Sequence, residues 1–413
     1  MSAKQVLIIG GGVAGLTAAN ALAIDGLKVA LVEKEPFLGG HAVQYACKAT
    51  DRCVKCGACL AEEKLKACVE SSFINKWLST RITSVSKSEY FSVTVESDPA
   101  YIDPLKCNGC NACLNACPQA GAIIQSYSKN NHPPVAVQTR VCRKFNGQNC
   151  QICQDVCPEN AIDLAQSQTS HTIEADAVVV AAGFRPFVPS SKPYGYGHLP
   201  NVITNLELER MLRQHKQALR PSDRQPAHHI AFIQCVGSRE AKLNHLWCSQ
   251  VCCGSTLRMG RLLKAHNPQT QITWYYIDVQ TFGKDFQSFY QDSKKEIQMV
   301  RMIPGDIIPV AEDRLQLSYF DNQTGQGVDA VFDLVVLAIA LLPFEDASRI
   351  AELFALQPAA SGFFSTTDNK TGPLPHGLFT AGTTTGPMSI PESISSAQQT
   401  AWQVVDYLKL DSI

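Results

Sequence analysis

The sequence has almost no net charge and no long uninterrupted apolar run. Its 413 residues include 36 basic and 37 acidic ones, so it lacks the positive excess with which proteins attract nucleic acids or anionic lipids. The stretch 6–23 has the length of a membrane span but is broken by a glycine-rich turn, and 334–344 is too short. We therefore expect no nucleic-acid partner, and contact with a membrane only through partner subunits.

A secretion signal is also lacking, because Met1 leads within a few residues into an apolar strand pattern without a basic segment or cleavage site. Cysteine, in contrast, is abundant, with 17 residues. Disulfide scaffolds are small and secreted, whereas an odd cysteine count with C-x2-C spacings favours metal ligation in a reducing compartment. The sequence thus predicts a cytoplasmic protein, and its length predicts two or three domains.

Cysteines are densest between residues 107 and 157, where C-N-G-C-N-A-C-L-N-A-C-P has the spacing of bacterial two-cluster ferredoxins. In that arrangement the fourth cysteine of each run ligates the other cluster. The predicted ligands of the first [4Fe–4S] cluster are Cys107, Cys110, Cys113 and Cys157. Those of the second are Cys142, Cys150, Cys153 and Cys117. Seven residues separate Cys142 from Cys150 where two are usual, so Cys142 is the weakest assignment. Four thiolates also suit zinc, but paired runs that both end in Cys-Pro favour clusters, and hence electron transfer.

A glycine-rich turn near the start predicts a dinucleotide site. Gly10, Gly12 and Gly15 match G-x-G-x-x-G between an apolar strand at 6–9 and a helical pattern at 16–23. Such glycines permit a tight turn, close approach of pyrophosphate and close packing of the helix. A second strand at 28–32 delivers Glu33, whose carboxylate would accept ribose hydrogen bonds. The full predicted set is Gly10, Gly12, Val13, Ala14, Gly15, Glu33 and Lys34. It does not separate FAD from NAD.

Three later turns favour FAD over NAD as the bound dinucleotide. The segments are Gly39-Gly40-His41, A-D-A-V-V-V-A-A-G at 175–183, and G-L-F-T-A-G-T at 377–383 followed by a helical pattern at 389–408. Their order resembles flavoproteins of the thioredoxin reductase class. The resemblance implies an α/β fold of two Rossmann-like domains, bound FAD, and further FAD contacts at Gly39, Gly40, His41, Ala182, Gly183 and Gly382. A Rossmann-like domain that binds no cofactor is the alternative.

A further cysteine stretch follows the second strand. Cys53, Cys56 and Cys59 have cluster spacing, and either Cys68 or Cys47 would supply the fourth ligand of a third [4Fe–4S] cluster. A redox-active dithiol or a structural zinc site stays open as an alternative.

The second Rossmann-like domain lacks a phosphate-binding turn. After the strand that begins at 229, the sequence has Cys-Val-Gly-Ser-Arg in place of a second G-x-G-x-x-G, so we expect no pyridine-nucleotide site. The cysteines at this place are Cys235, Cys248, Cys252 and Cys253. They are either buried core thiols or ligands, and the adjacent pair Cys252-Cys253 favours ligands.

These motifs divide the chain into five segments. The prediction is an FAD domain at 1–100 carrying Cys53–Cys68, an inserted two-cluster ferredoxin at 101–160, more FAD domain at 161–225, a vestigial nucleotide-binding domain at 226–364, and the last FAD segment at 365–413.

Three runs resemble the A-type subunit of heterodisulfide reductase: F-I-Q-C-V-G-S-R at 232–239, W-C-S-Q-V-C-C at 247–253, and G-P-M-S-I-P-E-S-I-S-S-A at 386–397. The resemblance covers nearly the whole sequence. It implies bound FAD with a [4Fe–4S] cluster on Cys235, Cys248, Cys252 and Cys253. It also implies a complex with B- and C-type subunits and with ferredoxin, a hydrogenase or a dehydrogenase, and it leaves a homodimer open.

Two departures from that family matter. The family's flavin-proximal lysine corresponds here to Arg258, which keeps the charge but cannot lose a proton near neutral pH. Arg258 therefore favours relay or confurcation over bifurcation. The sequence also lacks the extra N-terminal domain and the second ferredoxin of the long methanogen form. This short form is similar to the A-type subunit of quinone-interacting membrane-bound oxidoreductase.

The sequence thus predicts an electron-transfer subunit with FAD and four [4Fe–4S] clusters that use sixteen of the 17 cysteines. Two other functions stay open. One is a self-sufficient NAD(P)H-dependent reductase like the flavoprotein half of glutamate synthase. The other is a scaffold subunit with mainly structural clusters.

Overall fold

The computed structural model describes residues 4–280, 283, 285–321, 324–364 and 375–410. Its first unit is built on a five-stranded sheet of order β20-β9-β1-β2-β3, in which every neighbouring pair is parallel. The strands of this first sheet are β1 (Gln5–Ile9), β2 (Lys28–Val32), β3 (Ile74–Trp77), β9 (Ala177–Val180) and β20 (Leu378–Thr380). The central strands are buried on both faces, which is why their sequences are continuously apolar.

Three helices cover one face of the first sheet. They are α1 (Val13–Ile24), α2 (Ala58–Glu70) and α9 (Ile390–Leu410). Ile8 of β1 belongs to one buried apolar cluster with Leu16 of α1, Leu65 of α2 and Val404 of α9. Because α1 consists largely of alanine and other small residues, α2 and α9 both pack directly against it.

An antiparallel sheet and a short helix cover the other face. The sheet has the order β4-β5-β8, and the helix is α8. Their bounds are β4 (Thr80–Lys87), β5 (Phe91–Ser97), β8 (Thr169–Ala175) and α8 (Ala347–Phe354). Phe91, Val93 and Val95 of β5 alternate with less buried residues and pack toward Leu7 and Ile9 of the first sheet.

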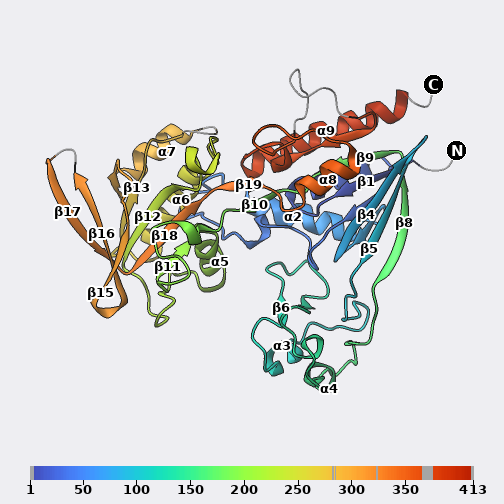
Figure 1. Ribbon diagram of the computed structural model, residues 1–413, viewed down its shortest axis with the longest axis horizontal. Coiled ribbons are helices and arrows are strands. Elements are labelled where there is room, and N and C mark those ends of the chain that lie inside the picture. Colours follow the sequence, from blue (N-terminus) through green and yellow to red (C-terminus); the bar gives the residue numbers. More distant parts are fainter. Residues whose placement is uncertain (1–3, 281–282, 284, 322–323, 365–374, 411–413) are drawn as a thin grey trace.

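An insert leaves this antiparallel sheet between β5 and β8 and projects from the first unit (Figure 1), which it contacts through hydrogen bonds between the Asn131 side chain and the Leu38 backbone. Ser97 pairs with Thr169, so the insert departs and returns at adjacent points of the sheet. Its elements are α3 (Ala112–Ala116), β6 (Ile123–Gln125), β7 (Val135–Val137) and α4 (Ile152–Asp155). Ile102, Val135 and Ile162 form its own small core together with cysteine side chains.

The second unit is built on another all-parallel sheet, of order β11-β18-β12-β13-β14. Its strands are β11 (Val202–Thr204), β12 (His229–Val236), β13 (Gln271–Tyr275), β14 (Gln298–Val300) and β18 (Leu334–Ile339). Its helices are α5 (Asn205–His215), α6 (Cys252–His266) and α7 (Phe286–Ser293). One face packs on these helices around Phe232 and Trp274.

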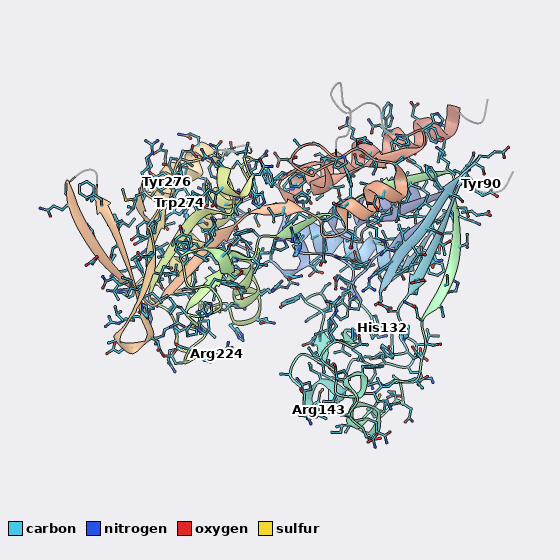
Figure 2. The ribbon with its side chains drawn as sticks, viewed as in Figure 1. Tyr90, His132, Arg143, Arg224, Trp274 and Tyr276 are labelled. Carbon is cyan, nitrogen blue, oxygen red and sulfur yellow. The ribbon has the colours of Figure 1, made fainter. Side chains whose placement is uncertain are left out.

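A three-stranded antiparallel sheet covers the other face of the second unit. It is formed by β15 (Ile307–Val310), β16 (Arg314–Asp321) and β17 (Gln326–Phe332). In Figure 2, Trp274 and Tyr276 lie in this unit, and their rings stack with centroids 4.6 Å apart. Short 3₁₀ helices complete the fold at Ala42–Gln44, Lys144–Asn146, Pro189–Ser191, Ala241–Leu243, Ala311–Asp313 and Gly382–Thr385.

The chain passes between the two units on one antiparallel pair, β10 (Phe184–Pro186) and β19 (Leu341–Pro343). Two predicted boundaries need correction for this reason. β11 already belongs to the second sheet, so the second unit begins before 226. The polar segment 220–227, which has the composition of a linker, is a loop of that unit, where Asn201 and Ser222 exchange hydrogen bonds. The chain then returns to the first unit through β19 and α8, ahead of the predicted boundary at 365, which itself lies outside the described residues.

Helix α5 begins with a capping box that gives a stability prediction. The Thr204 hydroxyl accepts a hydrogen bond from the Glu207 N–H, and the Glu207 carboxylate accepts one from the Thr204 N–H at 2.7 Å. Thr204→Ala should lower the free energy of unfolding by about 1 kcal/mol because the cap is lost. Denaturant unfolding followed by circular dichroism measures this. Thr204→Ser, which keeps the hydroxyl, is the control, and equal losses in both variants would assign the effect to the methyl group.

Candidate flavin and iron–sulfur sites

The glycine turn between β1 and α1 has the geometry that a bound pyrophosphate requires. Gly10 has φ +105°, and a Cβ there would lie 2.4 Å from the Ala181 carbonyl oxygen. A Cβ on Gly15 would lie 1.8 Å from the Gly10 carbonyl oxygen, so α1 can pack this close only with glycine there. A Cβ on Gly12 would meet no described atom within 4 Å, and Gly12 lines a cavity. The N-terminus of α1 therefore lies open to a phosphate group.

Glu33 ties the end of β2 to this turn. One carboxylate oxygen accepts a hydrogen bond from the Gly11 N–H at 2.6 Å, and the other accepts one from the Glu35 N–H at 2.8 Å. Burial raises the pKa of Glu33, and these two hydrogen bonds act in the opposite direction. Each carboxylate oxygen keeps lone pairs for a further donor, so the residue fits its predicted contact with a ribose hydroxyl.

The turn opens into a cavity of about 1500 Å³ that lies between the two units. This volume exceeds that of sites for drug-sized ligands and is sufficient for a dinucleotide. Of the predicted FAD contacts, the lining contains Gly10, Gly12, Val13, Ala14, Glu33, Lys34, Gly40, His41, Ala182 and Gly183.

Three predicted FAD contacts do not line the cavity but shape its wall. Gly15 lies beneath the turn, a Cβ on Gly39 would meet the Val43 side chain at 2.4 Å, and a Cβ on Gly382 would meet the Ala14 Cβ at 2.4 Å. The structure therefore shows close packing at these three positions, and their contact with FAD stays a prediction.

His41 presents a neutral ring to the cavity. Its imidazole lies 4.7 Å from the Phe184 ring, and its buried Nδ1 has no hydrogen-bond partner among the described residues. Burial and the nearby positive charge of Arg210 lower the pKa of His41 to about 4.

The cavity also contains a buried ion pair that the sequence did not reveal. The Lys48 ammonium lies 2.7 Å from the Glu209 carboxylate, and both side chains are 3% exposed. Lys48 also donates to the Ala46 carbonyl, and Glu209 accepts from the Ala46 N–H. Burial raises the pKa of Glu209, while Lys48 acts in the opposite direction. Nothing in the local sequence marks either residue, because Lys48 precedes the cysteine motif and Glu209 lies on an ordinary amphipathic helix.

The first predicted ferredoxin set is brought together in the insert. Cys107, Cys110, Cys113 and Cys157 line one small pocket. Burial raises the pKa of Cys113, and the thiolates of Cys107 and Cys157 raise it further. Four thiols around a common space are the donor set of a [4Fe–4S] cluster.

The structure brings together only part of the second predicted ferredoxin ligand set, which comprises Cys142, Cys150, Cys153 and Cys117. Burial raises the pKa of Cys153 to about 11, and the neighbouring Cys142 and Cys117 contribute. The stretched run is accommodated because its extra residues fold into the 3₁₀ helix Lys144–Asn146 and a left-handed turn at Gly147. This fold of the extra residues places Cys142 near Cys153 and Cys117. Cys150 lies just ahead of α4, partly exposed.

The four cysteines of the second unit gather where β12 passes to α6. Burial raises the pKa of Cys252 well above its ordinary value, and Cys253, Cys235 and Cys248 all raise it further. The Cys248 sulfur accepts a hydrogen bond from the Gln250 N–H at 3.2 Å. Arg239 forms a bidentate ion pair with Asp278, at 2.6 and 3.0 Å, beside this group. This donor set also fits a cluster.

The predicted fourth ligand of the Cys53 group requires correction. Cys59 and Cys68 lie on the same helix, α2, nine residues apart. Nine residues amount to about 13.5 Å along a helix and half a turn around it, so the two thiols lie on opposite faces. Cys68 is fully buried in the apolar core beneath α1, whereas Cys59 is exposed. Cys68 therefore does not join Cys53, Cys56 and Cys59.

Arg258 lies on α6 at the cavity wall. Its Nε donates a hydrogen bond to the Val54 carbonyl at 3.0 Å, and its guanidinium lies 5.5 Å from the Phe289 ring centroid. Burial lowers the pKa of Arg258, and the nearby Cys56 thiolate acts in the opposite direction. Its predicted position next to the flavin stays a prediction.

Two general findings concern the described part of the chain. Among the residues searched there, no three His, Cys, Asp or Glu side chains converge as they would around a single metal ion. In the same residues, no helix combines the length and the apolar character needed to cross a bilayer.

Comparisons with known proteins agree with this description. A family model described as FAD dependent oxidoreductase matches residues 5–76, and one described as 4Fe-4S binding domain matches residues 100–120. The chain resembles the A-type subunit of heterodisulfide reductase over almost its whole length. It is 32% identical to that subunit of the H(2):CoB-CoM heterodisulfide,ferredoxin reductase of Methanothermobacter marburgensis, over 96% of this chain and 63% of that protein.

A second relative is the A-type subunit of the ferredoxin/F(420)H(2)-dependent CoB-CoM heterodisulfide reductase of Methanosarcina acetivorans, which is 32% identical over 98% of this chain and 53% of that protein. The chain thus spans about half to two thirds of the length of these relatives. In fold, it matches the thioredoxin reductase of T. acidophilum with a TM-score of 0.54 and 13% identity, over 99% of both chains. The predicted thioredoxin-reductase-like α/β fold with a ferredoxin-type segment is confirmed.

The glycine turn gives a paired prediction. Gly12→Ala should leave the fold intact, because its Cβ has open space, but should weaken FAD binding at least tenfold by blocking close approach of the pyrophosphate. Gly15→Ala should instead destabilise the first unit, because its Cβ would overlap the Gly10 carbonyl. FAD titration by fluorescence and thermal unfolding of the apoprotein separate the two effects. A Gly12→Ala variant with unchanged FAD affinity would contradict the assignment of this turn.

The buried ion pair gives a second prediction. Lys48→Met should lower the free energy of unfolding by about 3–5 kcal/mol, because it leaves the Glu209 charge buried without its partner. Lys66→Met is the matched control, since its ion pair with Glu70 is about two-thirds exposed and contributes at most about 1 kcal/mol. The double variant Lys48→Met/Glu209→Leu should recover most of the loss in denaturant unfolding. A single variant as stable as the control would show that Glu209 is neutral in the folded protein.

Proposed function

We propose that this chain is an FAD- and iron–sulfur-containing electron-transfer subunit of a heterodisulfide-reductase-like complex. The observation that carries the proposal is that one cavity is walled by the flavin-type glycine turn and by three cysteine-bearing segments. Its lining includes Cys53 and Cys56, Val251 next to Cys252, and Gln138 of the insert. Electrons could thus pass between a flavin and several clusters over short distances.

The chain's own residues would hold the cofactor and control its surroundings. The α1 N-terminus and Gly12 would bind pyrophosphate, Glu33 would orient a ribose, and the neutral His41 ring would contact the bound group. FAD, when bound, converts two-electron into one-electron chemistry, and the protein supplies position and charge. The Lys48–Glu209 pair and Arg258 would set the electrostatic potential inside the cavity.

Four clusters would serve this role, at the two ferredoxin sets, the Cys53 group and the Cys235 group. Partners are inferred from the relatives, whose names describe subunits of heterodisulfide reductases linked to hydrogen, ferredoxin or F420H2. B- and C-type subunits, and a ferredoxin, hydrogenase or dehydrogenase, are therefore the proposed partners. Arg258 favours relay or confurcation over bifurcation, because it holds its proton. A disulfide-linked or a quinone-linked acceptor is compatible with this arrangement.

A self-sufficient NAD(P)H-dependent reductase is the competing function, because the fold has the second sheet on which such enzymes bind the nucleotide. In this chain the connection from β12 to α6 carries the Cys235 group where a phosphate-binding glycine turn would lie. That substitution favours the relay function.

The Cys235 group supplies the test. The protein, purified without oxygen, should contain about sixteen iron atoms, as expected for four [4Fe–4S] clusters. Cys252→Ala should lose about four of them and keep its FAD, and electron transfer between flavin and the remaining clusters should slow in stopped-flow spectra. Met259→Leu, on the same helix and similar in volume, should change neither quantity.

Two results would contradict the proposal. Rapid bleaching of the flavin by NADH or NADPH alone would support the competing reductase. Flavin and clusters that resist reduction by a low-potential reduced ferredoxin would instead indicate a structural scaffold.

A further inference from the structure

The loop that carries Cys53, Cys56 and Cys59 repeats the backbone of the first ferredoxin run. In both segments the third and fifth residues are left-handed, with φ 54° at Lys55 and 78° at Gly57, and with φ 75° at Gly109 and 61° at Asn111. Helix α2 begins at Ala58 and α3 at Ala112, so the third cysteine is the second helical residue in both. The Cys53 loop and the first ferredoxin run thus share their backbone conformation as well as their cysteine spacing.

This path is suited to an anionic cluster. Left-handed residues among ordinary ones turn successive backbone N–H groups toward one side, and such concave arrangements bind anions, including iron–sulfur clusters. In the Cys53 loop, the Lys55 N–H donates a hydrogen bond to the Cys53 sulfur at 3.4 Å. A lysine at positive φ is unfavourable in itself, so the loop is held in this shape by its surroundings.

The three thiols interact electrostatically, and a fixed positive charge lies beside them. Burial raises the pKa of Cys59, and Cys56, Glu63 and Cys53 raise it further. Arg258 donates to the Val54 carbonyl between the first two cysteines, and its guanidinium lies near Cys56. Cys53 and Cys56 line the flavin cavity, so a cluster on this loop would form part of its wall.

Of the two remaining cysteines of this region, Cys68 points away from the loop and Cys47 lies outside the cavity wall. Cys68 lies on the opposite face of α2, fully buried in the core. Cys47 directly precedes Lys48, whose side chain turns inward to Glu209 and lines the cavity. Cys47 itself is exposed and, unlike Cys53 and Cys56, is not part of the cavity lining.

We propose that Cys53, Cys56 and Cys59 hold a [4Fe–4S] cluster through three thiolates, with one iron that has no cysteine ligand. This iron would accept water or a small exogenous ligand such as a thiolate beside the flavin cavity. The inference rests on the proposed function, since it assumes that the chain carries clusters. It would differ from the proposed four-cysteine sites of the insert and of the second unit, whose clusters would be fully ligated by the chain.

Mild oxidation distinguishes such a cluster from the other three. Ferricyanide takes one electron from a [4Fe–4S]²⁺ cluster, which then releases its one Fe²⁺ without a cysteine ligand and leaves [3Fe–4S]⁺. Charge and iron balance in this step, because the cluster and the released ion together carry one positive charge more than before. The wild-type holoprotein should therefore give one [3Fe–4S] electron paramagnetic resonance signal per chain. Cys56→Ala should give none and should contain about four fewer iron atoms.

Two further variants test the ligand set. Cys68→Val and Cys47→Ala should keep the full iron content and the [3Fe–4S] signal, with valine chosen at position 68 to fill the buried space. Loss of the cluster in a folded Cys68→Val or Cys47→Ala protein that still binds FAD would overturn the three-thiolate proposal. Unchanged iron content in Cys56→Ala would also overturn it and would identify Cys53 and Cys56 as a dithiol.

The same samples separate this inference from the proposed function. A chain with FAD and about twelve iron atoms, none of them dependent on Cys56, contradicts the Cys53 cluster and leaves an electron-transfer function with three clusters. A chain with FAD but without any iron contradicts both. Mössbauer spectra of ⁵⁷Fe-enriched protein provide an independent measure, because an iron with a non-thiolate ligand gives its own quadrupole doublet. The absence of such a doublet in wild type would count against the open iron.

Discussion

The structure depends on the convergence of the carboxyl ends of two parallel sheets on one cavity. β1 leads into the glycine turn, β2 into Glu33 and β9 into Ala181, while β11 and β18 of the second sheet lead into Asn205 and Ala340. Side chains and backbone N–H groups at such strand ends are free for ligands, because the sheet hydrogen bonds stop there. The antiparallel pair β10–β19 keeps the two edges facing each other, so the cavity is a property of both units together.

The cavity between the two units contains a buried ion pair, and buried charges are energetically unfavourable unless both are paired. Lys48 and Glu209 come from different units and meet with 3% exposure, where each would be strongly unfavourable alone. The Ala46 backbone supplies both a donor and an acceptor to the pair, and Ser255 adds a hydroxyl on the Glu209 side. The pair links the two units at the cavity. It also places two opposite charges in the wall of a site of low dielectric constant. His41, uncharged and unpartnered at Nδ1 among the described residues, lies on the same wall.

The sequence was informative where the chemistry requires a residue type at a fixed spacing. Gly10 and Gly15 are specified by contacts that no side chain could tolerate, and Cys107, Cys110, Cys113 and Cys157 of the insert line one small pocket. It was misleading where a motif crosses an element boundary. Cys68 follows Cys59 at a plausible distance along the chain, but an uninterrupted helix places it on the other face. The Lys48–Glu209 contact spans more than 160 residues and has no local signature, and the polar segment near 220 resembles a linker although it closes a loop within the second unit.

In the proposed function, the two Rossmann-like units would use the same element for different anions. In the first unit, β1 leads through a side-chain-free turn into α1, whose N-terminal N–H groups and dipole favour the charge of a pyrophosphate. In the second, β12 leads into α6, whose first two residues are Cys252 and Cys253. A helix N-terminus lowers the cost of negative charge on thiolates for the same reason that it attracts phosphate. A cluster bound by four thiolates is such an anion, so replacing the glycine turn with cysteines changes the ligand but keeps the electrostatics. The second nucleotide site of a two-domain flavoprotein can thus become a cluster site without any change of fold.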